Sequence, residues 1–323
     1  MASIIRAENL RKVFGPITAV EDISLDVDIG EVLGFLGPNG AGKTTTMRML
    51  TGYLRPTRGS VSICGIDMLS SPVQAKRHIG YLPEGAPLYP EMTPADLLAF
   101  VGACRGLSGA ALSDRMARVS DMVNLGEVWT QPVETLSKGY KRRLGLAQAI
   151  LHDPDILILD EPTDGLDPNQ KREVRDLIRT MAREKAIVVS THILEEVNAV
   201  CSRALIIGKG RIVADGTPGE LAAMSRYHNA VTIRLASGET DALALKLDSL
   251  DTVSGVEKTA GHGQGQITAF PAAGRPIIQE VADLLREKHF EVFELRQETG
   301  RLDEVFRDVT ADPGGESVKG GAA

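Results

Sequence analysis

The chain has 323 residues, enough for a full-sized α/β domain and a smaller second one. Hydrophobic residues make up 43% and charged residues 24% of the chain, the balance of an ordinary soluble globular protein. The formal net charge of -7 argues against a nucleic-acid-binding protein, which would normally carry a basic face.

Cysteine usage and the N-terminus predict a cytoplasmic protein. Cys64, Cys104 and Cys201 lie far apart without metal-ligand spacing, so we expect reduced, packed thiols. The first residues contain no apolar core followed by a cleavage site, and no signal peptide is predicted. The apolar runs at 156–159 and 187–189 are too short to span a bilayer. Any membrane that this protein serves would therefore be reached through a partner.

The first segment, residues 4–29, alternates apolar and polar residues, which predicts half-buried antiparallel strands. Phe14 follows in a turn-like setting before Gly15 and Pro16. An aromatic ring there could stack on a base, with a gain of about 1–3 kcal/mol by analogy with base–aromatic contacts. The alternative is a core aromatic, which composition alone favours.

Residues 37–44 read Gly-Pro-Asn-Gly-Ala-Gly-Lys-Thr and fill every fixed position of the phosphate loop G-x-x-x-x-G-K-S/T. A predicted strand at 31–36 precedes the loop and a predicted helix at 44–50 follows it, which favours phosphate binding over an ordinary glycine-rich turn. Lys43 would reach the β- and γ-phosphates, and Thr44 would offer its hydroxyl to Mg²⁺. The predicted nucleotide contacts are Gly37, Pro38, Asn39, Gly40, Ala41, Gly42, Lys43, Thr44 and Thr45.

Strands are predicted next at 59–63 and 79–82, the second ending at Pro83 and Glu84. The pattern then turns helical from 93 to 124, where Thr93 is a good N-cap and a second helix covers 113–123. This insertion between strand-bearing halves predicts a helical subdomain at about 85–150.

A second group of polar positions follows. Residues 136–140 read Leu-Ser-Lys-Gly-Tyr before a basic run at 141–143; alone, this is equally a capped helix with a solvated face. Asp160 and Glu161 end an apolar strand at 156–159, and a turn at 165–168 leads into a predicted helix at 169–184. A buried strand at 186–190 precedes His192, which alone is more often a structural hydrogen-bonding residue.

In this order, residues 37–44, 136–140, 160–161, 165–167 and 190–192 resemble the phosphate loop, signature, Walker B, D-loop and switch-histidine motifs of ABC transporter ATP-binding subunits. The resemblance covers roughly residues 4–224. The run at 79–85 and the long C-terminal tail look most like the exporters whose permeases are separate, type-2 chains. The resemblance favours adenine stacking for Phe14 and a switch role for His192.

The resemblance also implies site roles. Asp160 would hold Mg²⁺, Glu161 would be the general base for the attacking water, and His192 would contact the γ-phosphate of ATP. Two subunits would pack head to tail as a homodimer. ATP at Lys43 of one subunit would then face Ser137 and Gly139 of the other, with Asp167 of the D-loop close by.

Two departures from the family pattern stand out. Glu84 replaces the usual glutamine; its carboxylate can still ligate Mg²⁺, but it adds charge and donates no hydrogen bond unless protonated. Lys138 and Tyr140 stand where glycine and glutamine are commoner in the signature, while Ser137 and Gly139 are kept.

The tail has its own pattern. Strands are predicted at 231–235, 253–258, 266–270 and 290–295, with helices at 241–249, 276–289 and 302–308. The order β-α-β-β-α-β suggests a ferredoxin-like module with a dimer-stabilising or regulatory role. The predicted domains are thus 1–224, 225–310 and a disordered tail at 311–323, rich in glycine and small residues.

The predicted fold is therefore a P-loop α/β core with antiparallel and helical subdomains and a small α+β domain. The predicted function is an ATPase that powers an exporter, docked on a separate integral-membrane permease at the inner face of the plasma membrane. A soluble ABC protein acting in translation or DNA repair is disfavoured by the single cassette. A P-loop kinase or GTPase is disfavoured because no Asn-Lys-x-Asp run occurs, and an inactive binding module because Glu161 and His192 are present.

Overall fold

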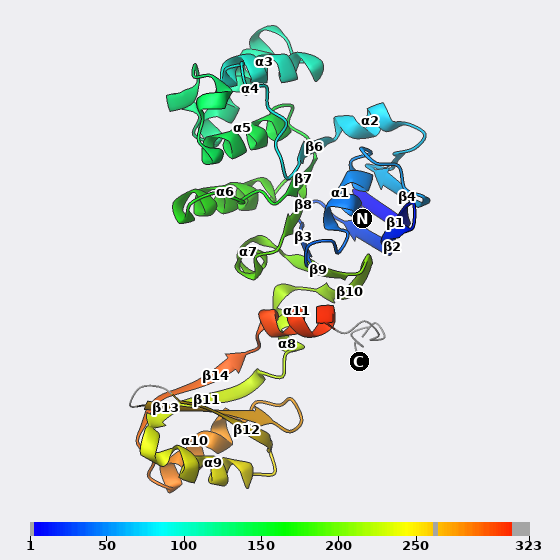
Figure 1. Cartoon of the computed structure of the whole chain (residues 1–323). Helices are drawn as coiled ribbons and strands as arrows, with labels where there is room; N and C mark the ends of the chain where they lie inside the picture. Colours follow the sequence, from blue (N-terminus) through cyan, green and yellow to red (C-terminus); the bar gives the residue numbers. More distant parts are fainter. Residues whose placement is uncertain (1–2, 261–263, 312–323) are drawn as a thin grey trace. The chain divides into compact units, whose positions relative to one another are not determined.

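The computed structural model describes residues 3–260 and 264–311, which divide into two compact units between Thr217 and Pro218 (Figure 1). The sequence placed this boundary after residue 224. Helix α8 (Pro218–Ala223) instead belongs to the second unit, where it packs on α11 (Leu302–Ala311). The predicted disordered tail lies, from residue 312 onward, outside the described residues.

The first unit is built on a sheet of ten strands in the order β5-β4-β1-β2-β10-β9-β3-β8-β7-β6. Its antiparallel part confirms the strands expected from the alternating N-terminal pattern. The strands are β1 (Ile5–Phe14), β2 (Ile17–Val27), β3 (Val32–Leu36), β4 (Arg58–Ile63), β5 (Ile66–Asp67), β6 (Ile79–Leu82), β7 (Ile156–Asp160), β8 (Ala186–Thr191), β9 (Arg203–Gly208) and β10 (Arg211–Gly216). The last two, and β5, were not predicted.

Strands β3, β8, β7 and β6 run parallel, and every residue of β3, β7 and β8 is buried, as continuous apolar runs predict. Alternate side chains of each strand enter two separate hydrophobic cores: Leu157 and Leu159 enter one, Ile156 and Ile158 the other. Asp160 pairs with Ser190 at the carboxyl ends of neighbouring strands. Residues that follow these strands are therefore brought to one edge of the sheet.

Helices cover both faces of this sheet. They are α1 (Lys43–Leu50), α2 (Pro72–Arg77), α3 (Pro94–Cys104), α4 (Gly109–Met122), α5 (Lys138–Ile150), α6 (Pro168–Met181) and α7 (Leu194–Val200). Helices α3, α4 and α5 pack on one another and gather at one end of the unit, apart from α1 (Figure 1). The second predicted helix begins at Gly109, earlier than the expected residue 113. Cys104 is exposed, so the expectation of a packed thiol is wrong there.

The second unit has a four-stranded antiparallel sheet in the order β12-β13-β11-β14. Its strands are β11 (His228–Ala236), β12 (Val253–Ala260), β13 (Gln264–Pro271) and β14 (Val292–Thr299). Helices α9 (Thr240–Asp248) and α10 (Ile278–Glu287) pack on this sheet around a shared apolar core. These bounds confirm the elements predicted for the tail.

Among the described residues, no helix is both long and apolar enough to cross a lipid bilayer.

Candidate functional site

The loop between β3 and α1 needs its glycines for close approach of the backbone. A Cβ on Gly37 would lie 2.6 Å from the carbonyl oxygen of Ile207. Gly42 has φ of 106°, and a Cβ there would lie 2.6 Å from the carbonyl oxygen of Ala19. Other residues would therefore distort the loop. Lys43 turns back over it, with Nζ donating to the carbonyl oxygens of Gly37 at 2.6 Å and Pro38 at 3.1 Å.

Lys43 is a buried cation that faces three carboxylates. Only 6% of the residue is exposed, and burial lowers the pKa of its ammonium group. The negative charges of Glu161, Asp160 and Glu84 act in the opposite direction and raise that pKa. The charges expected around a nucleotide phosphate and its metal ion thus converge on one lysine, although Glu84 itself is exposed.

Asp160 is the buried carboxylate at the end of β7, with 1% of the residue exposed. Its Oδ1 accepts a hydrogen bond from the Ser190 hydroxyl, whereas Oδ2 is buried and has no hydrogen-bond partner in the described part of the chain. An unpaired buried carboxylate oxygen is costly unless it meets a cation. Asp160 Oδ2, with the hydroxyl of half-buried Thr44 in the first turn of α1, fits the oxygen ligands that Mg²⁺ prefers.

Glu161 is held next to Asp160 in an unusual backbone conformation. Its φ is 51°, in the left-handed region that costs a non-glycine residue about 1–3 kcal/mol. The Glu161 amide donates to both the carbonyl oxygen and the hydroxyl of Ser190 at 3.1 Å, which stabilises this conformation. Glu161 Oε1 lies 2.9 Å from His192 Nδ1. The structure therefore brings together the carboxylate and the imidazole that the sequence singled out.

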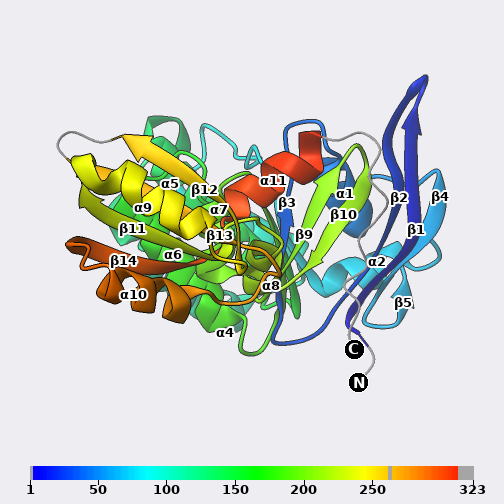
Figure 2. The same cartoon turned by 90° about the horizontal axis from the view of Figure 1, so that it is seen from below.

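The signature residues lie on α5, at a distance from α1 (Figures 1 and 2). Ser137 caps this helix, its Oγ accepting from the Tyr140 amide at 3.3 Å. A Cβ on Gly139 would lie 2.6 Å from the side-chain Oε1 of Gln170 on α6, so Gly139 packs closely against the start of that helix. Lys138, one of the departures, pairs with Asp164, the residue before the D-loop motif, at 2.8 Å and lowers the pKa of that carboxyl.

The structure also locates two further residues that were predicted to contact the nucleotide. Phe14, at the end of β1, is 45% exposed, and the Lys12 ammonium lies 5.1 Å from its ring centroid. The alternative that Phe14 is a core aromatic is therefore wrong. Asp167 caps α6, its Oδ1 accepting from the Gln170 amide at 2.9 Å.

Arg142 was missed by the sequence, which treated residues 141–143 as an equally plausible solvated face. The residue is only 6% exposed and points from α5 into the core. Its guanidinium donates to the backbone carbonyl oxygens of Pro83 at 2.9 Å, Glu84 at 2.8 Å and Pro162 at 3.4 Å, and to those of Asp160 and Glu161. One side chain thus joins the helical subdomain to both carboxylate-bearing segments.

Glu196 was also missed. It lies on α7, only 4% exposed, and accepts hydrogen bonds from the hydroxyls of Thr163 and Thr191. It therefore joins the segment after Glu161 to the strand end that precedes His192. Two glutamates are adjacent at 195 and 196, and the sequence alone does not indicate which of them is buried.

A phosphate loop and buried carboxylates at one edge of a parallel sheet define a P-loop nucleoside triphosphatase. The family described as ABC transporter matches residues 20–164. The daunorubicin/doxorubicin resistance ATP-binding protein DrrA of Streptomyces peucetius is 34% identical over 96% of this chain and 93% of its own length. A solved structure described as an ATP binding subunit of an ABC transporter aligns with TM-score 0.64 and 30% identity, over 69% of this chain and 93% of that one.

The chain therefore belongs to the ABC transporter ATP-binding proteins, a class of ATP-hydrolysing subunits that power membrane transport. The resemblance expected from the five motifs is confirmed. A further relative, the probable multidrug ABC transporter ATP-binding protein YbhF of Escherichia coli strain K12, is 38% identical over 69% of this chain. The match spans only 39% of the length of YbhF.

Proposed function

We propose that this chain is the motor subunit of an exporter, hydrolysing ATP to ADP and phosphate while docked on a separate membrane permease. The observation that carries this proposal is the convergence of Lys43, Asp160 and Glu161 at the edge of the parallel sheet. A buried lysine in a phosphate loop and an unpartnered buried carboxylate oxygen make a site for a triphosphate and its metal ion.

Each residue then has a chemical role. Lys43 and the loop amides bind the phosphates, and Phe14 offers an exposed ring to the adenine. Mg²⁺, held by Thr44, Asp160 and Glu84, would neutralise the charge that develops on the phosphates. Glu161 accepts the proton of the attacking water, and His192, 2.9 Å from Glu161, orients that carboxylate.

The site is proposed to be completed by a second copy of the chain. Ser137 and Gly139 begin α5, which both views place away from the phosphate loop of the same chain (Figures 1 and 2). A capped helix start is suited to meet a γ-phosphate, because its amides and partial positive charge favour anions. Head-to-tail packing of two copies would bring it to Lys43 of the partner and give two equivalent sites.

A cleft in the first unit supports docking on a membrane protein. It has a volume of about 640 Å³ and is lined by the exposed Tyr53 and Val73 together with Lys76, Arg77 and Arg105. Exposed apolar side chains beside cations suit a short cytoplasmic helix of a permease. The chain would then lie at the inner face of the plasma membrane.

The second unit is proposed to be a ferredoxin-like regulatory or dimer-stabilising domain. Its element order βαββαβ, and a sheet in which β13 lies between β12 and β11, support this topology. DrrA matches this chain through both units, and its name refers to drug resistance. We therefore favour export of a small-molecule cargo over import.

The experiment that tests the ATPase is a pair of variants. Glu161→Gln keeps the size and a hydrogen-bonding oxygen but cannot accept the proton, so we expect ATP binding to persist while turnover falls about 10²–10⁴-fold. Lys43→Ala should instead weaken ATP binding itself. Wild-type turnover in the first variant would remove Glu161 from the role, and unchanged ATP affinity in the second would contradict the phosphate loop.

Mixing two inactive chains tests the dimer. Lys43→Ala and Ser137→Arg each damage a different half of every composite site, so a mixed dimer should contain one intact site. We expect partial ATPase activity to return on mixing. If it does not, crosslinking between cysteines placed at 39 and 137 separates strictly coupled sites, which would crosslink, from a wrong head-to-tail arrangement, which would not.

A further inference from the structure

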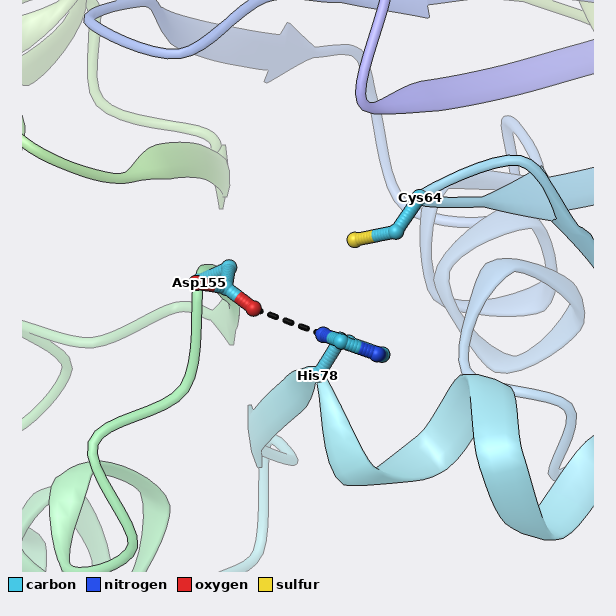
Figure 3. A group of neighbouring side chains, drawn as sticks. All are labelled: Cys64, His78 and Asp155. Carbon is cyan, nitrogen blue, oxygen red and sulfur yellow. Dashed lines mark hydrogen bonds and ion pairs between the residues drawn. The ribbon is translucent and has the colours of Figure 1, made fainter.

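Three metal-binding side chains meet on the side of the first unit away from the nucleotide residues. They are Cys64 in the turn between β4 and β5, His78 at the end of α2, and Asp155 just before β7. One ligand atom of each lies within 4.8 Å of those of the other two. Figure 3 shows the Cys64 sulfur facing the gap where His78 Nδ1 approaches Asp155 Oδ2 at 2.6 Å.

The backbone holds these residues in place. The Cys64 amide donates to the carbonyl oxygen of Ile4 at 2.7 Å, fixing the turn to the start of β1. The His78 carbonyl oxygen accepts from the Ile156 amide at 3.0 Å, so the residue before β6 is bonded to the residue after Asp155. Main-chain bonds therefore hold the three segments next to one another, with the three donor atoms close enough together to share one ion.

We propose that Cys64, His78 and Asp155 form a zinc site. Thiolate sulfur, imidazole nitrogen and carboxylate oxygen are the ligands of tetrahedral Zn²⁺, and three protein ligands leave the fourth position for water. On binding, Cys64 releases its thiol proton to solvent, and His78 ligates through Nδ1 with its proton on Nε2. The two negative ligands then balance the charge of the ion, and no redox step is involved.

Three protein ligands with a water are the usual coordination of catalytic zinc, but the position of this site, away from the nucleotide residues, indicates a structural role. Strands β6 and β7 are parallel, with Ile79 opposite Ile156 and Leu82 opposite Leu159. His78 and Asp155 precede these strands, while Glu84 and Glu161 follow them, so the two sites lie at opposite ends of the same strand pair. A zinc ion at this position links the β4–β5 turn to the parallel strands β6 and β7 and does not contact the nucleotide.

The competing explanation is a hydrogen-bonded His78–Asp155 pair with Cys64 beside it by chance. The test is a Co²⁺ titration of the untagged, reduced, nucleotide-free chain, because thiolate ligation to Co²⁺ gives a charge-transfer absorption band. We expect one equivalent of Co²⁺ to produce this band and Zn²⁺ to abolish it by displacement. Zn²⁺ should also raise the melting temperature, since an ion that binds only the folded chain stabilises it.

Matched variants decide between the explanations. Cys64→Ala should lose the band and the Zn²⁺-dependent rise in melting temperature. His78→Ala should weaken Zn²⁺ binding by more than the about 10–100-fold that loss of an outer-shell partner costs. Cys104→Ser removes an exposed thiol elsewhere and should change nothing. The proposal is overturned if the wild-type chain gives no saturable band, or if the band survives Cys64→Ala.

Discussion

Replacing Arg142 with methionine tests how the helical subdomain is joined to the carboxylate-bearing strands. Methionine keeps an unbranched side chain of similar length, so the packing of the stem along α5 is largely preserved. What is lost is the guanidinium and its hydrogen bonds to the carbonyl oxygens after β6 and around the end of β7.

The size of the expected loss of stability follows from the burial of the Arg142 guanidinium and of the carbonyl oxygens it contacts. A hydrogen bond to a charged group contributes about 1.5–3 kcal/mol net, and a buried carbonyl left unpaired costs about 1–3 kcal/mol. Against this stands the cost of burying the cation, which lowers the pKa of Arg142 and which the variant no longer carries. After this offset, we expect the carbonyl oxygens left unpaired to lower the free energy of unfolding by about 1–3 kcal/mol.

The assay combines urea unfolding with nucleotide binding and turnover. A loss of this size leaves a domain of ordinary stability folded, so all three can be measured on one preparation. We expect ATP affinity to change little, because Lys43 and its loop lie on β3 and α1. Turnover should fall at least tenfold, because Glu161 is no longer bonded to α5. Arg142→Lys should resemble the methionine variant, since one ammonium cannot reproduce the planar fork.

The matched control is Arg143→Met, one residue further along α5. Its guanidinium pairs with the exposed carboxylate of Glu173 at 2.8 Å and lies over the Tyr140 ring. Such a pair contributes about 0–1 kcal/mol. If Arg142→Met costs no more stability than Arg143→Met, the argument from buried hydrogen bonds is refuted. If the Arg142→Met chain is destabilised but keeps wild-type turnover, only the claim that Arg142 positions Glu161 is refuted.

Three further predictions follow from single residues. Glu84→Gln should keep much of the Mg²⁺-dependent ATPase because an oxygen ligand survives, whereas Glu84→Ala should raise the Mg²⁺ requirement; superimposable Mg²⁺ titrations would contradict this. Phe14→Ala should weaken ATP binding by the equivalent of about 1–3 kcal/mol, read by equilibrium titration. Burial, then the charge of Arg105, lowers the pKa of His152 to about 4. As the pH falls, His152 is therefore protonated at a higher pH in the unfolded chain than in the folded chain. The free energy of unfolding drops by up to about 3 kcal/mol between about pH 6.5 and 4. Urea unfolding of His152→Gln should show a smaller drop than the wild type.

The sequence predicted the central strands well because their physical setting leaves a strong pattern. Parallel strands covered on both faces are continuously apolar, as in 156–159 and 186–189, and polar residues directly after them mark one sheet edge. Glu161 was singled out in this way, whereas for His192 the pattern favoured a structural residue and only the resemblance to the family implied a role in the site. Strands β9 and β10 were missed although a turn at 209–210 separates their apolar runs, which is a hairpin signal.

The roles of residues that act through tertiary contacts could not be predicted from the sequence. Arg142 and Arg143 are neighbours of the same type, and only packing decides that one is inside. The same holds for Cys64, whose spacing to the other cysteines gave no metal signal. Its potential co-ligands are a histidine and an aspartate from distant segments, which only the folding of β4, α2 and β7 brings together.

Within the described part of the chain, the Arg142 guanidinium donates hydrogen bonds to main-chain oxygens only, and this has a consequence for the evolution of the site. A carbonyl oxygen is supplied equally by any amino acid, so positions 83, 84 and 160–162 can change their side chains without loosening the attachment of α5. Glutamate in place of the family's usual glutamine at 84 is such a change. Substitutions that change the metal or proton chemistry of the site can therefore occur without affecting the contacts that hold the helical subdomain in place.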